Sequence, residues 1–258
     1  MKNRRIFCGF LLTAFFALVS LPVFAGGGKE KAVTIYVTQH GKTLFNTKEL
    51  VQGWVDSPLT VEGIAMVEDL GRALRDVPFD YVISSDLIRA RQTARLVMAQ
   101  NRASKNYQAE NTEALREACF GQFEGEPNSI MAAAFTGVTG MTAEDTWRDP
   151  YMWLRLADAV KQLDTTGISE NAATIKKRMQ EKLVEVAEAQ AKKGGNVLLV
   201  AHGMSINIML SDIDPSFTYT GTPLENASVC KVVYQGGKFS IESFNDTSYI
   251  GKGRALHP

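Results

Sequence analysis

The sequence is poor in the residues that build disulfide frameworks and metal sites. Its 258 residues include three cysteines and three histidines. It has no C-x-x-C pair and no His/Cys cluster, so it predicts neither a disulfide-rich scaffold nor a metal site. One cysteine, Cys8, lies in the apolar N-terminal segment. Cys119 and Cys230 are far apart in the sequence, and whether they pair is left open.

An excess of charge of one sign is also absent. The 28 basic side chains balance the 28 acidic ones, so no broad field attracts nucleic acid or an anionic membrane, and we expect no nucleic-acid partner. The one long apolar run, residues 6–20, is shorter than the ~20 residues that a membrane-spanning helix needs.

That run has the layout of a secretory signal peptide. Lys2, Arg4 and Arg5 precede it, and Val23-Phe24-Ala25 offers a small-residue cleavage site after it. We predict a signal peptide over residues 1–25, a mature chain of residues 26–258 without a stable membrane span, and a periplasmic or extracellular location. An uncleaved membrane anchor is the alternative.

The mature chain alternates between strand and helix patterns. Apolar or β-branched runs predict strands at residues 33–38, 81–83 and 196–201. Helical spacing of apolar residues predicts helices at residues 60–77, 84–100 and 170–192, with Thr60 and residues 84–86 as N-caps. Two late strands, 229–234 and 238–244, flank Gly236-Gly237 and indicate a hairpin. The pattern predicts an α/β fold, a three-layer α/β/α sandwich with a mostly parallel central sheet.

Residues 126–164 do not fit this alternation. They are rich in methionine and aromatic residues, including Met131, Trp147 and Trp153. We expect a helical insertion, or lid, that packs over the active-site end of the sheet. Its apolar side chains are expected to form core rather than a binding cage.

Two histidines occur in the same local pattern. His40 and His202 each end a strand-like run and precede a glycine, Gly41 or Gly203. Ligands of open α/β sheets bind at the carboxyl ends of strands, and glycine allows a close backbone approach there. We therefore expect both imidazoles to converge on one ligand, the alternative being two satisfied loop histidines.

Five blocks of sequence carry a resemblance to a known family. They lie in order at residues 38–46, 53–63, 84–94, 115–125 and 200–203. The third reads Ser-Ser-Asp-Leu-Ile-Arg-Ala-Arg-Gln-Thr-Ala. Together they resemble the histidine phosphatase superfamily (phosphoglycerate-mutase-like), and their spacing is more similar to its mutase and small-phosphatase branch than to its acid-phosphatase and phytase branch.

The resemblance implies a role for each candidate residue. His40 would attack the phosphorus and become phosphohistidine, and His202 would donate a hydrogen bond to the transferring group. Arg89 would clamp the phosphoryl oxygens, and Asn46 would add a neutral donor. Glu117 would protonate the leaving alcohol and then activate water. No metal or cofactor is implied, because side chains can meet the phosphoryl charge; Glu113 and Glu124 remain alternatives to Glu117.

One position departs from the family pattern. The arginine that usually precedes the nucleophile is Gln39 here, and Lys42 stands where an acid is usual. Losing one transition-state donor can lower a rate on the order of 10²–10³-fold. We consider two outcomes equally: Lys42 turns inward and restores positive charge, or it points to water and the site is weakened.

Three functions stay open from the sequence. The first is an exported phosphomonoesterase that acts on a small phosphorylated substrate through phosphohistidine. The second is a catalytically weakened relative that binds a phosphorylated or other anionic ligand, as Gln39 suggests. The third is a phosphoglycerate mutase. The identity of the substrate and the oligomeric state cannot be read from the sequence.

Overall fold

The computed structural model describes residues 31–257. The predicted signal peptide therefore lies outside the described residues. Within residues 31–257, no helix combines the length and the apolar character needed to cross a bilayer.

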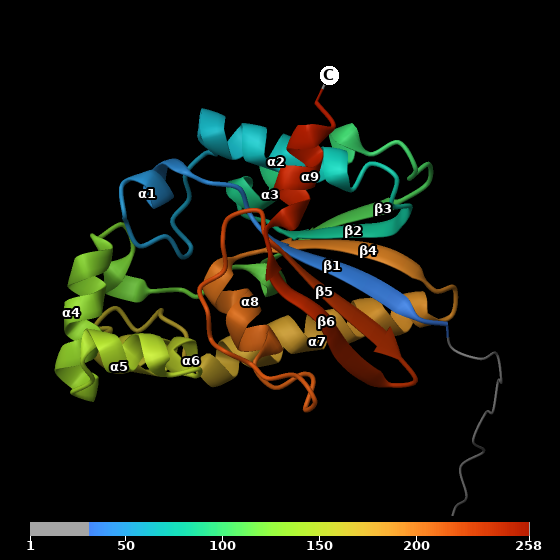
Figure 1. Cartoon of the computed structure of the whole chain (residues 1–258). Helices are drawn as coiled ribbons and strands as arrows, with labels where there is room; N and C mark the ends of the chain where they lie inside the picture. The colour runs from blue at the N-terminus through green and yellow to red at the C-terminus, as the bar shows by residue number, and fades with distance from the viewer. Residues whose placement is uncertain (1–30, 258) are drawn as a thin grey trace, which may run out of the picture.

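A six-stranded mixed sheet forms the centre of the molecule (Figure 1). Its spatial order is β3 (Gln108–Thr112), β2 (Phe79–Ser85), β4 (Gly195–Ala201), β1 (Val33–Gln39), β5 (Val229–Gln235) and β6 (Lys238–Asp246). The first four strands run parallel, and β5 and β6 form an antiparallel hairpin through Gly236 and Gly237, whose φ angles are 59° and 75°. Because Gln39 pairs with Ala201, the residues that follow them, His40 and His202, leave the sheet side by side.

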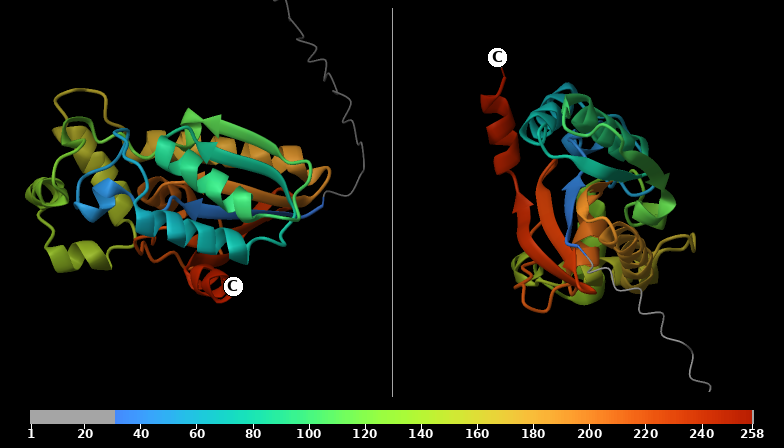
Figure 2. Two further views of the ribbon diagram at one scale, coloured as in Figure 1. Left: turned by 90° about the horizontal axis from the view of Figure 1, so that it is seen from above. Right: turned by 90° about the vertical axis from the view of Figure 1, so that its right-hand side faces the viewer.

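Helices cover both faces of this sheet (Figures 1 and 2). On one face lie α2 (Val61–Ala73), α3 (Ile88–Gln100) and α9 (Ser248–Ala255), and on the other lie α7 (Ala172–Ala191) and α8 (Gly203–Leu210). Strand β4 is apolar and buried on both faces, as expected for the middle of a parallel sheet. The predicted three-layer sandwich is confirmed.

Three helices occupy residues 126–164, where the sequence predicts a helical insertion. They are α4 (Asn128–Thr139), α5 (Ala143–Arg148) and α6 (Met152–Leu163). They lie beyond the end of the sheet at which β1 leads into the short helix α1 (Leu44–Thr47), as Figure 1 shows. Two 3-10 turns, η1 (Glu113–Leu115) and η2 (Gly121–Phe123), connect β3 to this helical region.

Two helix boundaries differ from the prediction. Helix α2 ends at Ala73 rather than at residue 77. Helix α3 starts at Ile88, because β2 continues through Ser85 and the N-cap Leu87 makes no side-chain cap bond. Asp86 is therefore not a cap: its carboxylate accepts from both Arg116 Nε (2.8 Å) and Nη2 (2.6 Å).

Several elements were not predicted, among them the short helix α1, helix α8, strand β3 and helix α9. Strand β3 is an edge strand of mostly polar residues, so it lacks an apolar pattern. Helix α9 contains Gly251 and Gly253, which lower helix propensity. Gly253 is needed there because a Cβ at this position would lie 1.7 Å from the carbonyl oxygen of Asp69, so only glycine lets α9 pack closely on α2. Cys119 and Cys230, whose pairing was left open, are both free and buried.

Candidate active site

The structure brings the two histidines together, as the sequence predicts. The ring centroids of His40 and His202 lie 5.2 Å apart, with 60° between the ring planes. His40 is 4% exposed and His202 is fully buried. Gly41 lets the loop after β1 pack tightly on α2, since a Cβ there would lie 2.5 Å from Val67 Cγ2.

Hydrogen bonding defines the tautomer of His40. Its Nδ1 lies 2.8 Å from the carbonyl oxygen of Gly41, which can only accept, so Nδ1 carries the proton and donates. The lone pair is then on Nε2. Burial and the Arg89 charge lower the pKa of His40 to about 3, against the Gly41 hydrogen bond that raises it. His40 is therefore a neutral imidazole at physiological pH, with a nucleophilic Nε2.

His202 has the opposite tautomer. Arg89 Nε donates to its Nδ1 at 3.1 Å, so Nδ1 accepts and Nε2 carries the proton. Burial, with the charge of Arg89, holds the pKa of His202 well below 6.5. Its Nε2 is buried without a hydrogen-bond partner among the described residues. An unpaired buried donor is costly, so this N–H is poised to bond a ligand.

The N–H donors of Arg89, which the sequence predicts to clamp the phosphoryl oxygens, are all directed at protein acceptors in this structure. The fully buried side chain has five N–H donors, and each has a protein acceptor. Besides the bond to His202, Nη1 donates to Asp56 Oδ1 at 3.0 Å and Nη2 to the carbonyl of Gly53 at 2.7 Å. The other two acceptors are the carbonyls of Val55 and Gln52. Arg89 is thus a positioning residue, which orients His202 and holds the loop of residues 52–56.

Glu117 lies at the N-terminus of α8. Its Oε2 accepts from Met204 N at 3.0 Å, and its Oε1 accepts from Ser205 N at 2.8 Å and from Ala118 N at 2.9 Å. The carboxylate thus caps α8, whose N-cap His202 makes no side-chain cap bond. Burial raises the pKa of Glu117, although these backbone bonds and the charge of Arg89 oppose the shift.

The two alternative acids lie elsewhere. Both oxygens of Glu124 accept from backbone N–H groups, including those of Trp54 (2.9 Å) and Val55 (3.0 Å), so Glu124 shapes the loop that also binds Arg89. Glu113 pairs with Arg116 and its side chain is 77% exposed. Of the three candidates, Glu117 alone lines the cavity beside His40.

The departure at Gln39 leaves a neutral amide in the site. Its side chain lines the cavity and packs against Gly203, where a Cβ would lie 3.0 Å from Gln39 Oε1. The ammonium of Lys42 lies 2.8 Å from Glu62 on α2 and is absent from the cavity lining. Lys42 therefore has the outward position in this structure, and whether it restores positive charge near a bound phosphoryl group stays a prediction.

Asn46 keeps one group for a ligand. Its Oδ1 accepts from Thr43 N at 3.1 Å in a capping box of α1, which leaves the Nδ2 donors toward the cavity that Asn46 lines. Sequence reasoning missed Asn226, whose Nδ2 donates to the carbonyl of His40 at 3.1 Å. Nothing in the local pattern of a loop asparagine signals such a contact, which joins residues 186 positions apart.

A cavity of about 210 Å³ opens on His40 and Glu117. It is walled by residues from β1, α1, α4, α6 and α8 and from the loop before β5. Its lining contains no lysine or arginine, and Glu117 is the acid in it. Within residues 31–257, no group of His, Cys, Asp or Glu side chains could hold a metal ion.

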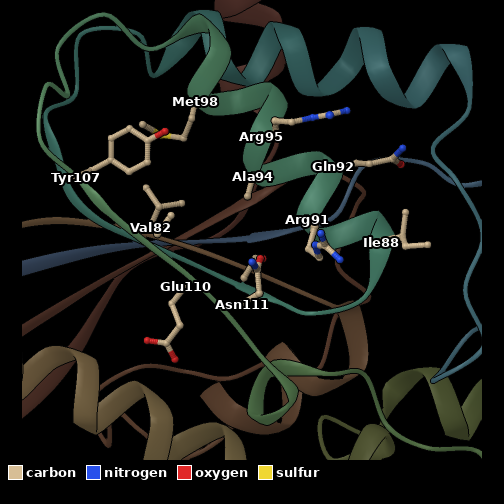
Figure 3. Close-up of a pocket in the computed structure, with 12 residues that line it drawn as sticks. Val82, Ile88, Arg91, Gln92, Ala94, Arg95, Met98, Tyr107, Glu110 and Asn111 are labelled. Carbon is tan, nitrogen blue, oxygen red and sulfur yellow. The ribbon is translucent and has the colours of Figure 1, made fainter.

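A larger cavity, of about 470 Å³, lies on the other side of α3 (Figure 3). Helix α3 contributes Arg91 and Arg95 to it, and the opposite wall comes from Tyr107 and β3. Neither guanidinium group makes a hydrogen bond or a contact ion pair with another residue in the part of the chain that the structure describes. None of the candidate catalytic residues lines this second cavity.

Comparison with known proteins places the chain in a family. Residues 35–247 match the model of the histidine phosphatase superfamily (branch 1), and the protein belongs to that superfamily. It is 27% identical to the 2,3-bisphosphoglycerate-dependent phosphoglycerate mutase of Chlamydia pneumoniae, over 81% of this chain and 96% of that one. It is 40% identical to the fructose-2,6-bisphosphatase TIGAR of Xenopus tropicalis, over 36% of this chain and 34% of that one.

Solved structures agree. A phosphoglycerate mutase from Bacillus anthracis str. Sterne superposes with a TM-score of 0.81 at 38% identity, covering 88% of this chain and 98% of that one. A phosphoserine phosphatase from Entamoeba histolytica superposes with a TM-score of 0.63 at 22% identity, covering 84% and 99%. The latter similarity supports the fold alone. The relatives thus include both phosphatases and mutases.

Proposed function

We propose that this protein is an exported phosphomonoesterase that works through a phosphohistidine on His40. The observation that carries the proposal is the pairing of complementary tautomers: His40 offers a lone pair on Nε2, and the neighbouring His202 offers an N–H. A nucleophile and a hydrogen-bond donor side by side are what phosphoryl transfer requires.

In the first step, Nε2 of His40 attacks phosphorus and the P–O bond to the alcohol breaks. The Nε2–H of His202 bonds an equatorial oxygen, and the Nδ2 of Asn46 adds a second donor. A protonated Glu117 delivers its proton to the leaving oxygen. Burial supports this role, because it raises the pKa of Glu117.

In the second step, the carboxylate of Glu117 takes a proton from water, which attacks phosphorus. The P–N bond breaks, inorganic phosphate leaves, and His40 and the protonated Glu117 are regenerated. Arg89 takes no direct part in either step. Its hydrogen bond to Nδ1 of His202 keeps the imidazole proton on Nε2, the atom that donates to the phosphoryl group.

Export rests on residues 1–25, whose positive start, apolar run and cleavage site are typical of a signal peptide. It favours hydrolysis over mutase chemistry, because a mutase needs primed phosphoglycerate pools inside cells. The cavity lining supports the same choice. Phosphoglycerates carry a carboxylate, and the lining has no basic side chain to pair with it.

The second candidate is a weakened relative that binds an anion without turnover. Gln39 and the lack of a cation in the lining favour it. Incubation of the mature protein with p-nitrophenyl phosphate separates the candidates. The proposal expects hydrolysis that His40→Ala abolishes, and an acid-labile ³²P label on wild type after quenching. Stabilisation by phosphate against heat without turnover indicates the binding protein, and interconversion of phosphoglycerates indicates the mutase.

The pH profile tests the acid. His40 is already neutral above a pKa of about 3, so kcat/KM should not fall on its account until the pH is near that value. Glu117 must be protonated for the first step, so kcat/KM should decline as the pH rises through its raised pKa. Glu117→Gln should lower kcat/KM and remove this decline. An unchanged decline in the variant would assign it to another group.

A further inference from the structure

The cavity beside His40 has an extensive apolar wall. It consists of Met131 of α4, Trp153 and Leu156 of α6, and Leu50, Pro223 and Leu224 from two other segments. The indole N–H of Trp153 donates to the carbonyl of Gly221 at 2.8 Å, so this ring offers a ligand only carbon surface. A leaving group that reaches this wall therefore meets hydrocarbon.

The polar side chains near the wall add little for a charged leaving group. The Gln52 amide is held by protein partners, since Oε1 accepts from Thr43 Oγ1 at 2.6 Å and Nε2 donates one N–H to Ser57 Oγ at 2.9 Å; the amide carries no charge. Asn46 and Gln39 lie beside His40, where the phosphoryl group must sit. Only Asn128, at the exposed start of α4, gives the rim a polar side chain.

The charges around the cavity disfavour a second anion. Glu117 is acidic, Arg89 has donated all five N–H groups to protein acceptors, and Lys42 is paired with Glu62 outside the lining. A carboxylate or second phosphate on the leaving group would lose water without gaining a cation, and an unpaired buried charge costs several kcal/mol.

We propose that the cavity selects phosphomonoesters whose alcohol is apolar and uncharged, an aryl or short alkyl group, and discriminates against alcohols that carry a carboxylate or a second phosphate. This selectivity rests on the proposed phosphomonoesterase function. The size fits: a cavity of about 150 Å³ holds a benzene ring, and this one has about 210 Å³. The helices of residues 126–164 thus determine specificity through Met131, Trp153 and Leu156.

The test compares two substrates that differ in charge but little in shape, 4-acetylphenyl phosphate and 4-carboxyphenyl phosphate. For wild type, kcat/KM should be at least about tenfold lower for the carboxylate, as an unpaired charge in the cavity requires. Equal values, or a preference for the carboxylate, would overturn the proposal.

A positive charge added at residue 128 should change the ratio of kcat/KM for 4-carboxyphenyl phosphate to kcat/KM for 4-acetylphenyl phosphate. Asn128→Lys places an ammonium at an exposed position, so folding is not at risk. It should raise the carboxyphenyl value relative to the acetylphenyl value by roughly two- to fivefold, because an exposed ion pair contributes up to about 1 kcal/mol. The matched control is Ala133→Lys, an exposed position on the same helix outside the lining, which should leave the ratio unchanged.

The two proposals can fail separately. If wild type hydrolyses neither ester, the phosphomonoesterase function fails. Titration calorimetry with 4-acetylphenyl and 4-carboxyphenyl phosphonates, which cannot be hydrolysed, then decides the selectivity alone. A Kd about tenfold or more weaker for the carboxyl compound supports an apolar site, by the same charge argument. Equal Kd values overturn it.

Discussion

Two of the cavities in the described part of the chain, the one beside His40 and the one between α3 and β3, differ in a way that reverses the usual expectation for a phosphatase. The cavity that opens on His40 is the smaller, and its lining contains no basic side chain. The cavity between α3 and β3 is larger, and its lining includes Arg91 and Arg95, whose guanidinium groups have no contact partner among the described residues, and one acid, Glu110, but no histidine. Size and positive charge would both select the second cavity.

Helix α3 is common to both regions. Arg89 is fully buried and binds His202, whereas Arg91 and Arg95 of the same helix are exposed. The candidate catalytic site is therefore identified by buried polar side chains whose hydrogen bonds fix their orientation. The most informative atom is Nε2 of His202, which is buried and has no partner among the described residues. Exposed charge alone does not identify the site.

The largest expected effect on turnover comes from replacing the buried arginine, Arg89. Arg89→Met removes the donor that holds the tautomer of His202, and turnover should fall on the order of 10²–10³-fold, as for loss of a transition-state donor. It also leaves Asp56 without its partner, so the free energy of unfolding should fall by about 3–5 kcal/mol, as for a broken buried ion pair. Steady-state kinetics and urea denaturation measure the two effects.

Three further variants on α3 distinguish the effect of the position of an arginine from the effect of its charge. Arg89→Lys keeps the charge but loses the geometry of the Nε bond, and it should still lose most of the turnover. Arg91→Met and Arg95→Met should stay within about twofold of wild type, as exposed substitutions usually do. A large loss of turnover in either exposed variant would show that the cavity between α3 and β3 also contributes to catalysis. The contrast between the two cavities would then be wrong.

A smaller effect should follow from adding a cation to the cavity that lacks one. Gln39→Arg places a guanidinium beside His40, and a hydrogen bond to a charged group contributes about 1.5–3 kcal/mol. Turnover of p-nitrophenyl phosphate should therefore rise roughly 10–100-fold. Gln39→Met, which keeps the length but has no donor, is the control and should not gain. No gain in the arginine variant would mean that the neutral donors already suffice.

The meeting of the two histidines could be predicted because it depends on local pattern. Apolar runs identify β1 and β4, and parallel neighbours end at the same edge of a sheet, so His40 and His202 had to emerge together. Glu117 was predicted by a different route, from the resemblance of the block at residues 115–125 to the family, because no strand or helix pattern precedes it.

The partners of the site residues could not be predicted, because they depend on how distant loops fold together. Acceptors in the loop of residues 52–56 bind the guanidinium of Arg89. The carboxylate of Glu124 holds the same loop by accepting hydrogen bonds from the loop's backbone N–H groups. Neither contact has a periodic signature. Asn226, which binds the carbonyl of His40, belongs to the same class.

The smallest expected effect belongs to Lys42, and it tests whether charge near the cavity matters at a distance. The ammonium pairs with Glu62 at 2.8 Å, and the two side chains are 32% and 65% exposed, so the pair contributes at most about 1 kcal/mol. Lys42→Ala should leave turnover of p-nitrophenyl phosphate within about twofold of wild type, as for other exposed sites. A loss of tenfold or more would show that Lys42 leaves Glu62 and turns toward the phosphoryl group when substrate binds. Glu62→Gln would then raise turnover, because it frees the lysine without removing it, and the cavity would gain the cation that its lining lacks.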